Sequence, residues 1–568
     1  MQSFCYPLLL HSVILVSILL GTGHARVQIP SIDSTQLDSI TKGRILIEEL
    51  NCVACHQNSE LVSTSKKSPR LAKVGSRLSP DYIKKFLIDP KSTKPGTLMP
   101  HTLGHLNEKD RIKVAESLTH YLVSLDNKKK FELQVPDSVA AEHGEALFHQ
   151  VGCAACHSPR DDEGKEIMAE KSVPLGPLEK KYSHQGLTEF LKKPHAYRPS
   201  GRMPDLGLPH QDIEKISHYL LRKIQVPGNL KYMTWRGKVW EGLEGDVEKE
   251  AAGQVADFNL ESIGKIHHQT AIQYSGFLKI KTQGEYAFDL QLNGGSLTIN
   301  NKTIFNEKPS NRRGTKKFSV STNLEEGLSK IDFVYFHTGR DPKLIFEVEG
   351  PGLKKGPLSP EILTAYDRPI EISSALQTDP VLIAKGREHF TKMGCANCHD
   401  DINKEPLNSY PEMEKLRLGH GCLSNQNQAP RYDLDEEQKK LITAALRADK
   451  NFEYSDEQKI QKTLVQFNCI ACHDRAGLGG IHPSRNQYFT GSKPELGNQG
   501  RIPPPLTHVG AKLTDSWLKQ VILHGGRQRD YLHTRMPIYK QKKVEELVDL
   551  FQKNDSLEQL DHPKVSNI

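Results

Sequence analysis

Four pentapeptides with the pattern Cys-x-x-Cys-His decide how this chain folds. They are Cys52-Val53-Ala54-Cys55-His56, Cys153-Ala154-Ala155-Cys156-His157, Cys395-Ala396-Asn397-Cys398-His399 and Cys469-Ile470-Ala471-Cys472-His473, named motifs 1 to 4 in chain order. Two thiols three residues apart can each form a thioether with one vinyl group of a haem, and the histidine that follows then lies under the iron as its proximal ligand. Zinc half-sites and thioredoxin-like dithiols also use Cys-x-x-Cys, but neither needs a histidine after every copy. The motifs therefore predict four covalently attached haem c groups.

Cysteine usage favours the same conclusion. Eight of the ten cysteines lie in the motifs, and the other two are Cys5 and Cys422. No disulfide framework can be assigned to such a chain, although covalent haem attachment implies passage through an oxidising compartment.

The first 25 residues resemble a secretory signal peptide. Pro7 to Leu20 is a short apolar run, and Gly23-His24-Ala25 offers small residues at the −3 and −1 positions of a cleavage site. Because the preceding residues include no lysine or arginine, an uncleaved anchor is the alternative, but a run of 14 residues is short for a membrane span. No later stretch is long and apolar enough to cross a bilayer. We therefore expect a periplasmic or otherwise exported protein without an integral membrane span.

Length and composition indicate several globular domains. The chain has 568 residues, of which 36% are hydrophobic and 26% charged, and its formal net charge is +7 before any haem propionates are counted. Lysine pairs such as Lys84-Lys85 and Lys542-Lys543 are scattered along the chain. Most are expected on solvated helix faces, and a minority could form a docking patch for an acidic redox partner. No basic run is interleaved with aromatic residues, so nucleic acid is not an expected partner.

The repeat extends upstream of each motif. Nine residues before the first cysteine stand Gly43, Gly144 and Gly386, whereas the fourth copy has Ile460. A glycine inside a helix costs about 1 kcal/mol relative to alanine, and a close backbone crossing would explain it. Apolar residues recur five and two positions before each motif and predict an amphipathic helix leading into it: Ile47, Leu50, Phe148, Val151, Phe390, Met393, Leu464 and Phe467.

Three methionine-proline pairs follow the motifs at similar distances. Met99, Met203 and Met536 lie 43, 46 and 63 residues after the histidines of motifs 1, 2 and 4, each shortly before a predicted helix. A thioether is a suitable sixth ligand for haem iron. We therefore expect these methionines to be distal ligands, and packing in the core is the alternative for each.

Residues 26–126, 135–225 and 455–560 resemble class I cytochrome c domains, which are small and all-helical. The resemblance implies His56, His157 and His473 as proximal ligands and Met99, Met203 and Met536 as distal ligands. It also implies a backbone carbonyl near Pro69, Pro177 or Pro504 that accepts the proximal ring N–H. Tyr121 and Tyr219 are expected to pack against the first helix of their own module.

Residues 379–448 depart from this pattern. Ala429-Pro430 aligns with Met203-Pro204, so alanine stands where the sixth ligand of the third haem, attached through Cys395, Cys398 and His399, is expected. Either that haem is five-coordinate, or Met413, His420 or Cys422 takes the sixth position. His420 is the favoured candidate of the three, since Gly419 and Gly421 flank it and free its backbone. The third haem is therefore predicted to be the one most open to external ligands. The sequence around Cys422 also resembles cytochrome modules of planctomycete-type redox proteins.

Residues 230–352 contain no motif and alternate with period two, which predicts an antiparallel β-sandwich. The stretch resembles a PA14 module, on the basis of Gly284-Glu285-Tyr286-Ala287-Phe288, the Ser296–Ile299 strand and Gly350-Pro351-Gly352. PA14 modules of the lectin type bind calcium and sugar through paired aspartates, and Asn293-Gly294 stands at the corresponding turn. A spacer or docking role is therefore favoured over carbohydrate binding, and 353–378 is expected to be a linker.

The sequence as a whole predicts a multidomain protein with four small all-α cytochrome c-like haem modules and one all-β sandwich. The expected function is electron transfer between redox partner proteins. Two dihaem pairs are expected, separated by the sandwich. The short links at 127–134 and 449–455 suggest that the two haems of each pair lie close together. Two other functions remain open. The third haem could be a substrate site of a haem oxidoreductase, or the sandwich could bind a surface.

Overall fold

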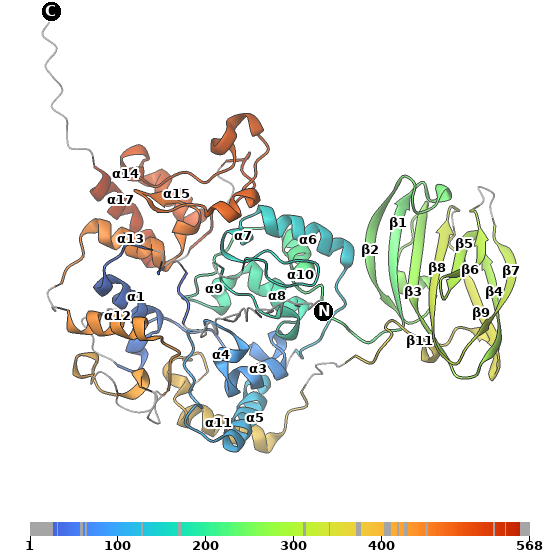
Figure 1. The fold of residues 1–568 in the computed structure, drawn as a ribbon, viewed down its shortest axis with the longest axis horizontal. Coiled ribbons are helices and arrows are strands. Elements are labelled where there is room, and N and C mark those ends of the chain that lie inside the picture. The colour runs from blue at the N-terminus through green and yellow to red at the C-terminus, as the bar shows by residue number, and fades with distance from the viewer. Residues whose placement is uncertain are drawn as a thin grey trace, which may run out of the picture.

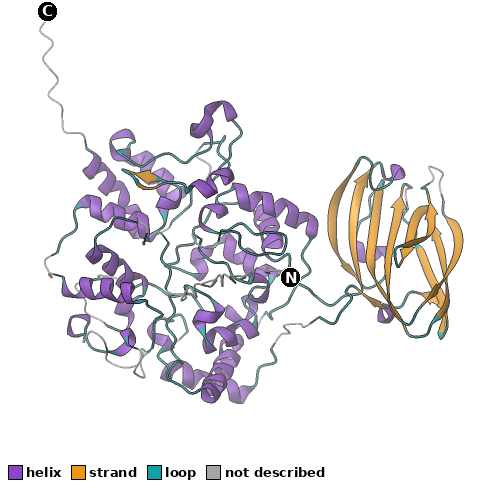
Figure 2. Cartoon of the chain, viewed as in Figure 1, coloured by secondary structure: helices purple, strands orange, loops and turns teal. Residues whose placement is uncertain are grey.

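The structure is a computed structural model that describes residues 27–556, apart from residues 31, 34, 57–60, 63–64, 127–128, 169–171, 310–313, 340, 371–375, 403–409, 417–419, 425–429, 449–451, 526–528 and 540. The expected signal peptide at 1–25 and Ala429 lie outside the described residues. A helical part and an antiparallel β-sandwich lie side by side (Figure 1). Figure 2 shows that almost all helix is confined to the first part and almost all strand to the second. The expected multidomain combination of helical and all-β parts is confirmed at this level.

The helical part consists of short helices on both sides of the sandwich in the sequence. Before the sandwich they are α1 (Ser39–Glu49), α2 (Val74–Arg77), α3 (Pro80–Ile88), α4 (Pro90–Thr93), α5 (Glu108–Ser124), α6 (Ser138–Gln150), α7 (Cys153–Cys156), α8 (His184–Lys192), α9 (Pro194–Tyr197) and α10 (His210–Leu220). After it they are α11 (Pro380–Lys392), α12 (Glu436–Arg447), α13 (Asp456–Gln466), α14 (Val509–Lys512), α15 (Asp515–His524), α16 (Lys542–Glu545) and α17 (Leu547–Asp555).

The four helices that lead into the motifs, α1, α6, α11 and α13, begin in the same way. Each has an N-cap whose side chain accepts a hydrogen bond from a backbone N–H of the first turn, and the caps are Asp38, Asp137, Asp379 and Ser455. Such caps satisfy donors that the helix leaves unpaired and contribute about 1 kcal/mol each. The amphipathic helices predicted before the motifs are therefore present and locally encoded.

Helix pairing does not follow chain order. Helix α6 packs on α10 and α13 on α17, each within its own stretch of sequence. Helix α1, however, packs on α12, and α11 packs on α5. The halves of the first and third expected modules, 26–126 and 379–448, are thus exchanged, so that neither stretch forms a self-contained unit.

The glycines nine residues before the motifs mark these helix crossings. A Cβ atom at Gly43 would lie 2.0 Å from the carbonyl oxygen of Leu441 in α12, and one at Gly386 would lie 2.1 Å from that of Ser117 in α5. At Gly144 the corresponding atom would lie 1.9 Å from Lys215 O in α10. The predicted close backbone crossing is confirmed, because only glycine fits at these approaches.

Tyr121 and Tyr219 pack on different kinds of partner because of the exchange between the first and third modules. Tyr219 packs on Phe148 of α6, with ring centroids 5.5 Å apart, as expected for its own module. Tyr121 instead packs on Phe390 of α11, 5.7 Å away, so the prediction for Tyr121 is wrong. The local helix pattern is the same in both cases, and the exchange changes the partner.

We define four helical units by what packs together: unit 1 (39–56 with 410–447), unit 2 (138–224), unit 3 (69–125 with 380–402) and unit 4 (455–555). They form a ring in the order 1, 3, 2, 4, with α1 and α12 at the left of Figure 1, α5 and α11 at the bottom, and α13 and α17 at the upper left. Units 3 and 2 meet where Ser79 N donates to Lys181 O and Ser183 N donates to Arg77 O, at 2.9 and 3.2 Å.

The contact between units 4 and 1 closes the ring. Glu48 of α1 is 6% exposed and pairs with Lys462 of α13 and Lys543 of α16, at 2.5 and 2.7 Å. Burial raises the pKa of Glu48, but the two lysines outweigh it and lower the pKa from 4.5 to about 2.

The sandwich has two sheets around one apolar core. One sheet has the order β2-β1-β3-β8-β5-β6, with β11 beside β3, and the other has the order β10-β9-β4-β7. The strands are β1 (Leu230–Gly237), β2 (Val247–Val255), β3 (Thr270–Ile280), β4 (Gly284–Leu292), β5 (Gly294–Ile299), β6 (Lys302–Glu307), β7 (Lys316–Leu324), β8 (Gly327–His337), β9 (Ile345–Gly350), β10 (Leu353–Pro357) and β11 (Leu363–Thr364). Strands β10 and β11 belong to the stretch expected to be a linker, so the sandwich extends beyond residue 352.

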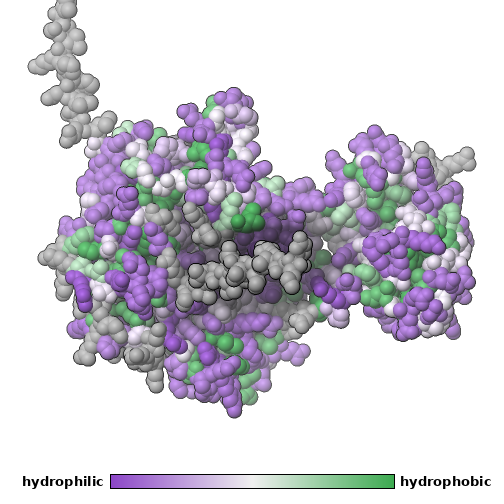
Figure 3. Space-filling model, in the orientation of Figure 1, coloured by the Kyte–Doolittle hydropathy of each residue, from purple (hydrophilic) through white to green (hydrophobic). Residues whose placement is uncertain are grey.

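The face shown in Figure 3 is mostly hydrophilic, with small separate apolar patches on both parts. Within the described ranges, no helix combines the length and the apolar character needed to cross a membrane.

Candidate haem sites

All four motifs begin at the same backbone turn. The residue before the first cysteine has a positive φ: 57° at Asn51, 118° at Gly152, 71° at Gly394 and 57° at Asn468. Glycine and asparagine tolerate this conformation and end the preceding helix. A hydrogen bond of 2.9 to 3.0 Å from the histidine N–H to the carbonyl of the first cysteine then closes each motif. The sequence Cys-x-x-Cys-His thus folds into one compact turn with both thiols and the imidazole close together.

Each motif histidine is oriented by one backbone carbonyl. The Nδ1 atoms of His56, His157, His399 and His473 lie 2.8, 2.9, 2.9 and 2.7 Å from the oxygens of Pro411, Val173, Pro69 and Pro504. A carbonyl accepts only, so Nδ1 carries the proton and Nε2 keeps a free lone pair. This is the tautomer that a proximal iron ligand requires.

The acceptors differ in part from those implied by the resemblance. Pro504 serves its own motif, as expected. Pro69 serves motif 3 rather than motif 1, and for motif 2 the acceptor is Val173 rather than a residue next to Pro177. Pro411, which supports motif 1, was not identified from the sequence. The sequence did contain a signal for Pro411. Pro411-Glu412-Met413 has the same pattern as Pro504-Pro505-Leu506, a proline followed two residues later by an apolar residue.

The motif thiols are free, as thioether formation with a haem requires, and partly buried. None of the motif cysteines forms a disulfide. Burial raises the pKa of the first cysteine in every motif, Cys52, Cys153, Cys395 and Cys469, to about 12. The uncharged form of these thiols is therefore favoured, and a thioether, which carries no charge, suits the same positions.

The methionine loops occur in two hydrogen-bonded pairs. Asp205, two residues after Met203, forms an antiparallel bridge with Ile538, two residues after Met536. His101, two residues after Met99, forms the same bridge with Arg431. Arg431 stands two residues after Ala429, so this loop has the register of the methionine loops. Met99 and Met203 are partly buried against the cores that contain Cys395 and Cys153 respectively.

Two buried tyrosines fix the register of the loops in units 1 and 4. The Tyr432 hydroxyl donates to Leu50 O and the Tyr539 hydroxyl to Phe467 O, both at 2.9 Å. Leu50 and Phe467 each stand two residues before the first cysteine of a motif. The signal in the sequence is a tyrosine three residues after Ala429 and after Met536, and our sequence analysis did not use it.

The motifs themselves meet in pairs. Asn397 of motif 3 lies with its side-chain nitrogen 3.8 Å from Cys55 Sγ of motif 1, and Asn468, directly before motif 4, lies 3.2 Å from Cys156 Sγ of motif 2. The close pairs are therefore motifs 1 and 3 and motifs 2 and 4, rather than the pairs of neighbours along the chain that short links suggested.

The candidates for the sixth ligand in the atypical stretch lie around motif 1. Met413 is 2% exposed in the core of units 1 and 4, and the ring of Tyr410 packs edge-on to His56. His420 is exposed, and Cys422 is partly buried. Cys422 lies close enough to Cys52 of motif 1 to contribute to the raised pKa of that thiol.

Positive charge accumulates near the loops that carry Met99 and Met203. The neighbouring cations Arg198, Lys181 and Arg202, together with burial, lower the pKa of Lys94 well below its usual value. Burial and the neighbouring Arg198 and Arg77 do the same to Lys181. A cluster of partly buried cations of like sign favours the binding of a compensating anion. Propionate carboxylates of haem groups fit this requirement.

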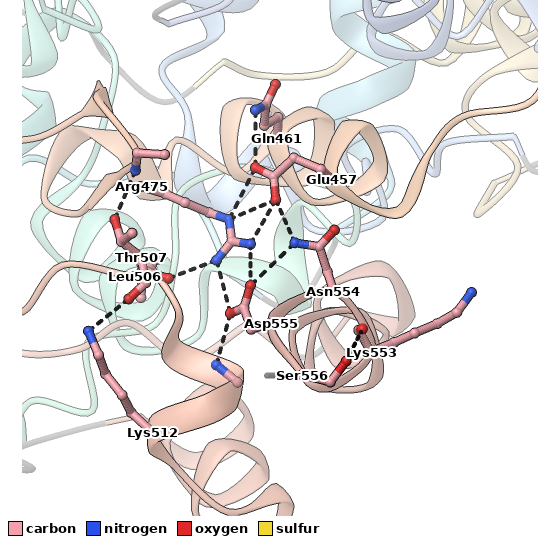
Figure 4. Close-up of polar contacts among 12 residues, drawn as sticks. Glu457, Gln461, Arg475, Leu506, Thr507, Lys512, Lys553, Asn554, Asp555 and Ser556 are labelled. Carbon is pink, nitrogen blue, oxygen red and sulfur yellow. Dashed lines mark hydrogen bonds and ion pairs between the residues drawn. The ribbon is translucent and has the colours of Figure 1, made fainter. Parts of the chain in front are cut away.

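An arginine clamp closes unit 4 (Figure 4). Arg475, two residues after His473, bonds Glu457 of α13 and Asp555 of α17, both at 2.7 Å, and Leu506 O at 2.8 Å. Asp555 also accepts from Gly510 N at 2.9 Å. The clamp connects the segment that begins at Pro504 to helices α13 and α17.

Comparison with known proteins identifies part of the helical region. Residues 141–222, which lie in unit 2, match the cytochrome c family. Cytochrome c oxidase subunit 2 of Bacillus sp. (strain PS3) is 33% identical over 99 residues, which is 16% of this chain and 27% of that protein. The chain thus spans about a quarter of that relative. The match supports a cytochrome c domain, covalent haem c and haem-based electron transfer.

Solved structures similar to the chain each cover a quarter of it. They include the PA14 domain of MpAFP antifreeze protein (TM-score 0.22, 14% identity, 25% of this chain and 94% of that chain). A PA14 sugar-binding domain from an RTX adhesin (TM-score 0.20, 14% identity) covers 25% of this chain and 100% of that chain. An anti-sigma factor domain-containing protein (TM-score 0.22, 19% identity) covers 25% of this chain and 49% of that chain.

Proposed function

We propose that the chain is an exported tetrahaem c-type cytochrome that carries electrons between periplasmic redox partner proteins. The observation that carries this proposal is the arrangement shared by all four motifs. In each one, two free thiols lie beside an imidazole whose Nδ1 is held by a backbone carbonyl at 2.7 to 2.9 Å. Haem iron supplies one-electron chemistry, and the residues around it set its potential.

The contacts between motifs support electron exchange within two pairs. The Asn397 contact to Cys55 places the attachment edges of motifs 1 and 3 next to each other, and the Asn468 contact to Cys156 does so for motifs 2 and 4. Units 3 and 2 share the contact at Ser79 and Ser183, so the ring offers a continuous route between the pairs.

The sandwich acts in this proposal as a spacer or docking module. Asn293, at the turn where lectin-type PA14 modules carry aspartate, donates from Nδ2 to Gly314 O at 3.1 Å and accepts from Thr338 at 3.3 Å. Its side chain is thus engaged in holding loops together. A haem oxidoreductase is the second candidate, and it depends on a haem that lacks an internal sixth ligand.

Intact-mass measurement of denatured mature protein tests the proposal. The expected mass includes four haem groups and lacks residues 1–25. Three or fewer haems in fully matured protein would overturn the tetrahaem assignment, and a retained N-terminus would overturn cleavage. A potentiometric titration should then resolve four one-electron steps. Electron paramagnetic resonance of the oxidised protein should show coupling within the pairs 1 with 3 and 2 with 4.

A further inference from the structure

The chain segment that lacks the expected methionine folds on motif 1. Pro411 O accepts from His56 Nδ1 at 2.8 Å, and the Tyr432 hydroxyl donates to Leu50 O at 2.9 Å, directly before the motif. Helix α12, which follows this segment, packs on α1. The described ends of the segment between Pro411 and α12 therefore lie at the first haem site and not at the third.

Comparison with unit 4 shows how the sequence of that loop aligns with a methionine loop. Tyr432 and Tyr539 make the same bond to the carbonyl two residues before their motif, and Met536 stands three residues before Tyr539. The residue three positions before Tyr432 is Ala429. By its offset from the tyrosine in the sequence, Ala429 is thus the residue that corresponds to Met536.

Met99 belongs to the third haem site by the same reasoning. Pro69 O holds His399 Nδ1, and Asp401, two residues after that histidine, accepts from the backbone N–H groups of Leu71 and Ala72 at 2.8 and 3.1 Å. The loop with Met99 follows this segment, and Met99 packs against the core that contains Phe390 and Cys395.

We propose that Met99 is the distal ligand of the haem at motif 3, and that the haem at motif 1 therefore lacks a methionine ligand and binds small external molecules such as carbon monoxide. The proposal rests on the tetrahaem function above. It reverses the pairing that chain order suggests, in which Met99 serves motif 1 and motif 3 is open.

Met413 and His420 are placed away from the distal side of the first haem, whereas Cys422 lies near Cys52 and Cys55 and is tested below by substitution. Met413 follows the proximal acceptor Pro411 by two residues, as Leu506 follows Pro504, and therefore lies on the proximal side. His420 is exposed. The Tyr432 hydroxyl is engaged with Leu50 O.

Removal of single haems separates the two pairings. The protein is reduced, titrated with carbon monoxide and compared with the variants Cys52→Ala/Cys55→Ala and Cys395→Ala/Cys398→Ala, and the intact mass of each confirms how many haems it carries. We expect one bound carbon monoxide in the unmodified protein, none without the first haem and one without the third. One without the first haem and none without the third would overturn the proposal in favour of chain order. A mass with fewer than four haems in the unmodified protein would instead refute the proposed function.

Substitutions that keep all four haems provide a second test in case those variants do not fold. Ala429→Met should abolish carbon monoxide binding and add a fourth methionine-iron absorption band, while Met99→Ala should raise binding from one to two molecules. Met233→Ala, in β1 of the sandwich, is the matched control and should change neither. Absence of carbon monoxide binding in the unmodified protein, with binding gained in Cys422→Ala or His420→Ala, would identify an internal ligand and overturn the open site.

Discussion

The Nδ1 atom of His56 lies 2.8 Å from the carbonyl oxygen of Pro411, 355 residues later in the chain. His399 forms the reciprocal contact with Pro69, 330 residues earlier, at 2.9 Å. These two bonds define the exchange between the first and third units.

Met413 should be a packing residue of unit 1 and not an iron ligand. Met413→Leu conserves volume and should change the free energy of unfolding by less than about 1.5 kcal/mol, whereas Met413→Ala leaves a cavity and should cost about 2–4 kcal/mol. Spectra of both variants should keep the full methionine-iron absorption. Loss of that absorption in Met413→Leu would identify Met413 as a ligand.

Met203 should be the distal ligand of the second haem. Met203→His replaces a thioether by a stronger σ-donor, so the potential of that haem should fall and its methionine-iron band should disappear. Redox titration and absorption spectroscopy measure both effects, with Met233→His in the sandwich as control. An unchanged band in Met203→His would mean that another residue holds the iron.

Arg485 should raise the potential of the second haem. It belongs to unit 4, is 3% exposed, and donates to the backbone oxygens of Ala154 and His157. A nearby positive charge favours the reduced iron, so Arg485→Gln should lower the potential by roughly 40 mV, on the order of 1 kcal/mol for one electron. Arg501→Gln, at another arginine of unit 4 that bonds Phe489 O, is the comparison. Equal shifts in both variants would argue against a specific effect.

Glu48 should stabilise the contact between units 1 and 4 in a pH-dependent way. Burial raises its pKa, but Lys462 and Lys543 outweigh burial and lower the pKa from 4.5 to about 2. A depressed pKa in the folded state gives stability that is complete above the unfolded value near 4.5 and is lost as the pH falls toward 2.

Glu48→Gln should therefore cost about 3 kcal/mol at neutral pH and flatten the acid dependence of unfolding between these two values. Glu436→Gln removes an exposed pair with Lys439 and should change stability by less than about 0.5 kcal/mol. Similar losses in the two variants would show that the Glu48 contact contributes no more than a surface ion pair.

The sequence by itself determined the local structures. The turn at each motif, the capped helix before it and the glycines of α1, α6 and α11 could be identified from residues within one helical length, as could the alternating strands of the sandwich. The edges of the sandwich were less predictable: β10 and β11 are short, and their pairing to β9 and β3 depends on contacts across the sheets.

Only the tertiary structure decided which half of a unit serves which motif. Motifs 1 and 3 follow similar helices, and segments 69–125 and 410–447 offer similar proximal carbonyls and final helices, so either pairing satisfies the same local preferences. Exchange of equivalent elements costs little energy. The choice depends on specific long-range contacts, such as Gly43 against Leu441 and Asp401 against Leu71, which chain order does not reveal.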